Sequence, residues 1–133
     1  MEVQERIKPR HLTAEQAAHF VQELKKIPDA AIELGFTSAA GDEAHNLAKQ
    51  LLPLFKQAGW LVRNEASLSN HLDIQVIGVA VIVPQVPKDN LIELSFAQLA
   101  LQSAFRDIGI ELQFIHLPNK EFSEIVIGSK PNP

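Results

Sequence analysis

A short loop in the first half of the chain holds side chains that could contact a ligand. It lies between an expected strand and an expected helix, and its candidate ligand-binding residues are Thr37, Ser38, Gly41, Asp42 and His45. Ligands of open α/β sheets bind beyond the carboxyl ends of the strands, so residues 37–42 could hold a small molecule or a nucleotide. The same residue types also suit a loop without a ligand, because hydroxyls and a carboxylate can satisfy free backbone N–H groups.

The loop lacks the usual features of a phosphate-binding site. Gly41 is its single glycine, and the acidic residues Asp42 and Glu43 stand where the helix would begin. Phosphate-binding loops use several glycines and often a lysine, whereas carboxylates at a helix start repel a phosphate. The sequence therefore indicates neither a P-loop nor a dinucleotide-binding motif.

A hydrolase would need a nucleophile with a base beside it. Ser38 and His116 are the candidates, because both would follow strands whose carboxyl ends could meet at one edge of the sheet. The GxSxG motif that presents a nucleophilic serine in many hydrolases is absent. We therefore expect a non-catalytic protein, with the hydrolase built on these two residues as an alternative.

The sequence also predicts no metal site and no cofactor. It contains no cysteine, and its five histidines show neither HxH nor HExxH spacing. These histidines are His11, His19, His45, His71 and His116. Scattered histidines of this kind are usually surface residues.

Length, composition and charge indicate one globular domain that does not bind nucleic acid. The chain has 133 residues, of which 46% are hydrophobic, and a net charge of −4. Its longest apolar run, residues 76–83, is too short to span a bilayer. A basic run near the start could contact lipid headgroups, although a solvated linker is the simpler interpretation; it comprises Arg6, Lys8, Arg10 and His11.

Apolar residues recur with helical spacing in three segments. Thr13 and Gln16 form a capping box that would start the first helix. Asp42 would cap the second helix, and either Asn90 or Ser95 would cap the third.

Five apolar runs indicate strands, at residues 31–37, 60–63, 74–83, 111–116 and 124–127. Strands that alternate with helices predict an α/β fold: a single three-layer domain with a mixed, mostly parallel sheet of about five strands and three helices. An α+β arrangement with the helices on one face is the alternative. We expect the domain over residues 12–128, with a tail or linker at 1–11 and a C-terminal tail at 129–133.

The last strand, Glu124–Ile127, could be an edge of the sheet. Edge strands present unpaired N–H and C=O groups that another chain can bind. The sequence therefore suggests a homodimer formed through this strand.

Three segments in this order resemble a known group of proteins: RHLTAEQAAHFVQEL from Arg10, SAAGDEAHNLAKQLLPLFKQAGW from Ser38, and SEIVIGSKP from Ser123. The chain resembles the soluble C-terminal domain of a group of uncharacterised bacterial membrane-anchored proteins. The resemblance implies a domain on the cytoplasmic or other soluble face of a bacterial membrane, tethered only through a segment outside this chain. We expect a non-catalytic module that binds a small molecule or a protein partner.

Overall fold

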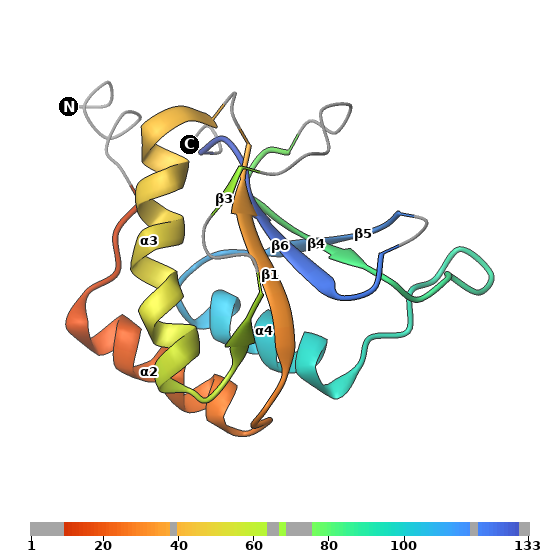
Figure 1. The fold of residues 1–133 in the computed structure, drawn as a ribbon, viewed down its shortest axis with the longest axis horizontal. Helices are drawn as coiled ribbons and strands as arrows, with labels where there is room; N and C mark the ends of the chain where they lie inside the picture. Colours follow the sequence, from red (N-terminus) through yellow and green to blue (C-terminus); the bar gives the residue numbers. More distant parts are fainter. Residues whose placement is uncertain (1–9, 38–39, 64–66, 69–75, 118–119, 131–133) are drawn as a thin grey trace.

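Two strand–helix–strand units that point in opposite directions provide most of the sheet (Figure 1). The computed structural model describes residues 10–37, 40–63, 67–68, 76–117 and 120–130. The described helices are α2 (Ala14–Lys25), α3 (Gly41–Gln57) and α4 (Phe96–Asp107). The described strands are β1 (Ala31–Phe36), β2 (Leu61–Val62), β3 (Ser67–Leu68), β4 (Val79–Val83), β5 (Leu112–His116) and β6 (Ser123–Ile127). The short strand β3 is not among the five strands expected from the sequence.

The strand order is β2–β1–β6–β4–β5, with β3 also paired to β1. Helix α3 connects the parallel strands β1 and β2, and helix α4 connects the parallel strands β4 and β5. Strand β6 joins the two units because it is parallel to β1 and antiparallel to β4. The predicted α/β class with a mixed, mostly parallel sheet and three helices is confirmed.

The prediction that Glu124–Ile127 forms a sheet edge is wrong. This segment belongs to β6, which has β1 on one side and β4 on the other. Both rows of its backbone groups therefore face neighbouring strands, and none remains for a second chain. Within the described residues, the edges are β5 on one side and β2 with β3 on the other.

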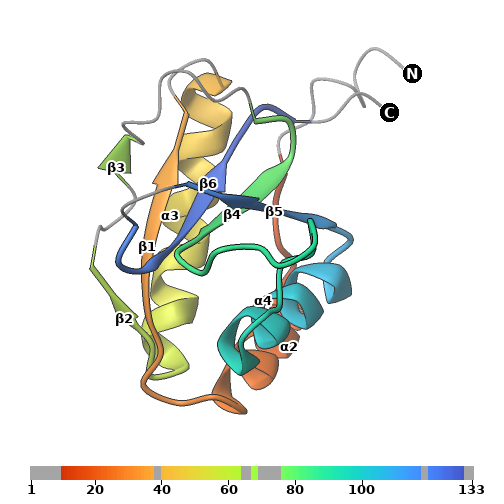
Figure 2. The ribbon, with the colours of Figure 1, turned by 90° about the vertical axis from the view of Figure 1, so that its right-hand side faces the viewer.

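All three described helices lie on one face of the sheet (Figure 2). Side chains from each helix share a core with Ile32, Leu34 and Ile125, which alternate onto the same face of their strands. At the centre of this core, the ring of Phe20 makes edge-to-face contacts with Phe55 and Phe105. In the described part of the chain, the helices thus cover one face of the sheet, as in the alternative arrangement, and do not form layers on both faces.

Local capping rules explain where two of the helices begin. Thr13 and Gln16 form the predicted capping box of α2, and Ser95, one of the two proposed caps, forms a capping box with Gln98 at α4. The prediction for the remaining helix is wrong. Helix α3 begins at Gly41, so Asp42 lies within its first turn instead of capping it, where its charge still favours the helix dipole.

Candidate functional site

The predicted ligand loop is tied to neighbouring elements in the part that the structure describes. The Thr37 N–H donates to the Ile127 carbonyl at 3.0 Å, which continues the pairing of β1 with β6. Gly41 has a φ of 69°, a conformation that glycine adopts readily, and it starts α3. Asp42 is exposed, and the His45 ring stacks on Phe36 with 4.3 Å between centroids. Ser38 lies outside the described residues.

His116 does not share an end of the sheet with Thr37. Pairing places Phe36, Ile127, Val79 and Leu112 in one row across the sheet. His116 lies four positions further along β5, which runs opposite to β1, and its Nδ1 is 3.3 Å from the Val83 carbonyl oxygen. Ser38 and His116 could meet only if β1 and β5 ended at the same edge of the sheet. Because β6 is antiparallel to β4, β1 and β5 end at opposite edges instead.

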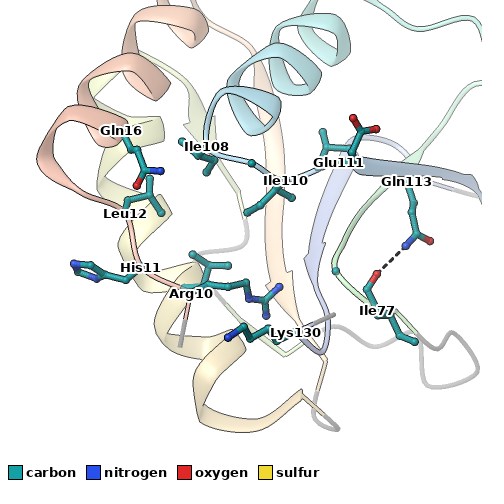
Figure 3. A pocket seen from close by; sticks show the side chains of 14 residues that line it. Arg10, His11, Leu12, Gln16, Ile77, Ile108, Ile110, Glu111, Gln113 and Lys130 are labelled. Atoms are coloured by element: carbon teal, nitrogen blue, oxygen red, sulfur yellow. Dashed lines mark hydrogen bonds between the residues drawn. The ribbon is translucent and has the colours of Figure 1, made fainter. Parts of the chain in front are cut away.

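A pocket of about 950 Å³ opens at the end of the sheet where β4 and β5 begin (Figure 3). Its walls come from five separate parts of the chain: residues 10–16 up to the first turn of α2, helix α3, the approach to β4, the stretch from the end of α4 into β5, and the residues after β6. Most of the lining surface is apolar, and the apolar side chains are Leu12, Leu47, Ile77, Ile108, Ile110 and Leu112. The polar and charged lining residues are Arg10, His11, Gln16, Glu111, Gln113 and Lys130.

Arg10 anchors the charged end of this pocket. Its Nε and Nη2 donate to the Glu43 carboxylate at 2.9 and 2.7 Å, and its backbone N–H donates to the same group at 2.8 Å. Nη2 also donates to the Gly128 carbonyl at 2.7 Å. The Arg10 side chain is only 11% exposed, so it does not belong to a solvated basic linker. It fixes the start of the domain against α3 and the end of β6.

Gln50 fixes the same segment from the other side. Its amide oxygen accepts from the Leu12 N–H at 3.2 Å, and its amide nitrogen donates to the Arg10 carbonyl at 3.4 Å. Because Gln50 belongs to α3, the wall formed by residues 10–12 is held against a helix. This wall includes residues that the sequence had placed in the N-terminal tail.

The pKa of Glu43 reflects its position beside Arg10. Partial burial alone would raise this pKa, but hydrogen bonds from the Arg10 side chain and backbone oppose that effect. The positive charges of Arg10 and Lys130 oppose it further, and the net result is a pKa below the ordinary value of 4.5. Glu43 is therefore ionised at neutral pH and balances one positive charge at this end of the pocket.

A second group of charges lies on the face of the sheet without helices. Glu33 and Glu124 are register partners on β1 and β6, and Lys120 donates to them at 2.7 and 2.8 Å. Glu124 is only 4% exposed. Burial alone would lower the Lys120 pKa, but hydrogen bonds to both carboxylates and their negative charges raise it overall. Lys120 thus stabilises two carboxylates that would otherwise repel each other across neighbouring strands.

A smaller hollow of about 240 Å³ adjoins these charges. The Arg63 guanidinium lies over the Phe122 ring, 4.3 Å from its centroid, and both residues line this hollow with Glu33 and Lys120. Its size and the mutual pairing of its charges indicate a structural ion-pair cluster.

The described residues contain no group of three or more histidine, cysteine, aspartate or glutamate side chains placed to hold a metal ion. No helix in the same part of the chain is both long and apolar enough to cross a membrane.

Sequence reasoning missed the pocket because its lining is assembled from distant segments. Arg10 and Glu43 are 33 residues apart, and Arg10 and Gly128 are 118 residues apart. The one nearby sequence feature that could have indicated the pocket is Arg10, which precedes the predicted start of α2. Neither pocket described above is lined by any residue from Thr37 to His45.

Comparisons with known proteins give no match, so a function for this chain is proposed from the geometry of the pocket. No protein-family model matches the chain, and neither the curated proteins nor the solved structures include a match to it.

Proposed function

We propose that this chain is a non-catalytic α/β binding module that holds a small molecule in the pocket beside Arg10. One observation carries the proposal: a cavity of about 950 Å³ has largely apolar walls and a few polar groups, including a guanidinium fixed by Glu43. Small-molecule sites typically have volumes of about 300–1,000 Å³, apolar linings and a small number of fixed polar groups. The pocket has all three properties.

The chemistry of the lining supports binding rather than catalysis. Its described residues include no serine, threonine or cysteine side chain that could act as a nucleophile. Glu111 is exposed and pairs with Arg106 at 3.7 Å, which leaves it accessible to water.

A thermal-shift screen with two matched variants tests the proposal. A ligand present at about 100 times its Kd stabilises the folded state by about 2.7 kcal/mol, which raises Tm by several degrees. The variant Ile110→Trp places a large ring in the pocket and should abolish the shift. The control Leu61→Trp adds the same ring at an exposed position on β2 and should retain it.

Two results would contradict the proposal. The first is a panel of acidic, neutral and basic apolar compounds that leaves Tm unchanged. The second is a ligand whose shift survives Ile110→Trp but is lost on changing Thr37 or Asp42, which would place the site at the loop.

A further inference from the structure

We infer that the ligand is an apolar molecule carrying one carboxylate, with its apolar body against the leucine and isoleucine walls and its carboxylate at Arg10. This inference rests on the proposed function, because it specifies what the same pocket binds. It depends on the uneven distribution of charge within the pocket and on the donor capacity that Arg10 retains.

The cationic side chains and the isoleucine side chains of the α4–β5 connection occupy different ends of the pocket (Figure 3). Arg10 and Lys130 lie at one end, whereas Ile108 and Ile110 lie across from them, on the connection between α4 and β5. A ligand that fills this space must therefore have an apolar part and a polar end. Neither a bare ion nor a uniformly polar compound would match both ends.

The charged end favours a negative group. Arg10 and Lys130 are both cationic and lie at this end, where their positive charges already stabilise the ionised form of Glu43. Glu111 is at the other side of the pocket, with its side chain 85% exposed and paired with Arg106. Water therefore screens its charge strongly. A cationic ligand would meet two cations at the end where its charge would have to lie.

The Arg10 guanidinium can donate further hydrogen bonds. Glu43 and the Gly128 carbonyl occupy Nε and Nη2, whereas Nη1 is buried and has no hydrogen-bond partner among the described residues. Buried donors are nearly always paired in proteins, so an unpaired one indicates a site where a further acceptor would be favourable. Guanidinium groups bind carboxylates with well-defined geometry, which matches the proposed head group.

Calorimetric titration of the whole chain with three compounds separates the two halves of this inference. Decanoate has both the apolar body and the carboxylate, decanol has the body alone, and acetate has the carboxylate alone. We expect decanoate to bind at least about tenfold more tightly than decanol, because a hydrogen bond to a charged group adds that much. Acetate should bind far more weakly than either, since each buried methylene contributes about three- to fourfold.

Variants then test the role of Arg10. The double variant Arg10→Gln with Glu43→Gln replaces the ion pair by two neutral amides, and it should bind decanoate no more tightly than decanol. Glu43→Gln alone leaves the guanidinium charge without its partner and should strengthen the preference. The control Arg63→Gln removes a cation that lines only the smaller hollow and should change neither affinity.

The outcomes distinguish the inference from the proposed function. Equal affinities for decanoate and decanol, both abolished by Ile110→Trp, would overturn the inference and leave the proposed function standing. Binding of neither compound would overturn the inference, and it would overturn the proposed function as well only if the wider panel of apolar compounds also left Tm unchanged. A preference for decanoate that persists in the folded double variant would also overturn the inference, because Arg10 would then not bind the carboxylate.

Discussion

The Arg10 guanidinium and the Glu43 carboxylate form a two-point ion pair, with N–O distances of 2.9 and 2.7 Å. Through this pair and the Gly128 carbonyl, one side chain joins the segment before α2, the first turn of α3 and the end of β6. The planar guanidinium suits this role because its donors are held in a fixed fork. The pair thus determines both the shape and the charge of the pocket beside it.

The lowered Glu43 pKa predicts that part of the stability is lost in acid. A carboxyl group whose pKa is lower in the folded state stabilises the fold at pH values above its unfolded pKa. That contribution should disappear as the pH falls from about 4.5 through the folded pKa. We expect urea unfolding of the Glu43→Gln variant to depend less on pH over this range than unfolding of the wild type. Equal pH dependence in the two proteins would show that the pair does not stabilise the fold.

The Lys120 cluster predicts a second pH effect, at the alkaline end. The Lys120 pKa is raised above 10.5 in the folded state, so its contribution is complete below that pH and is lost as the pH rises through the folded pKa. Thermal unfolding of Lys120→Gln should therefore be less sensitive to alkaline pH than that of the wild type. A variant at the exposed Lys88, Lys88→Gln, should retain the wild-type sensitivity.

At neutral pH the Lys120→Gln variant should also be much less stable. The change removes the cation that bridges Glu33 and the 4% exposed Glu124. Removing one partner of a buried ion pair costs about 3 kcal/mol or more, which corresponds to a fall in Tm on the order of 10 °C. A fall no larger than that of Lys88→Gln would show that the two carboxylates tolerate each other without Lys120.

The capping box of α4 predicts a smaller effect. The Ser95 hydroxyl accepts from the Gln98 N–H at 3.2 Å, and the Gln98 side chain accepts from the Ser95 N–H at 3.0 Å. Ser95→Ala removes the first of these bonds and should cost about 1 kcal/mol, or about 4 °C in Tm. Ser103→Ala makes the same change at an exposed position inside α4 and should not destabilise the protein, since alanine favours helix. Equal effects of the two changes would contradict the capping role.

Features that depend on nearby residues could be predicted from the sequence. The capping residues Thr13 and Ser95 bind N–H groups only three positions away, so their residue types are sufficient to identify the helix starts. Asp42 was misplaced because α3 begins at Gly41 after the N-cap position Ala40, two residues before the start that a cap at Asp42 would give. Local propensity therefore located the helices to within about a turn.

Features that depend on strand order could not be predicted in the same way. Glu124–Ile127 has the pattern of any short apolar strand, and nothing local indicates that it lies between β1 and β4. Because β6 is parallel to β1 and antiparallel to β4, strands β4 and β5 run opposite to β1. His116 therefore lies at the other end of the sheet from Thr37. The pocket was missed for the same reason, because Arg10 acquires its partner Glu43 only when the whole domain has folded.

The most direct test of the central claim is a titration of the isotope-labelled chain with decanoate, followed by the NMR shifts of backbone amides. If the ligand binds beside Arg10, the largest changes should occur in residues 108–113, at Ile77 and Gly78, and at Leu12. Amides of β2, on the far side of the sheet, should change little. Changes centred instead on Thr37, Gly41, Asp42 and His45 would contradict the account and would place the ligand in the loop before α3.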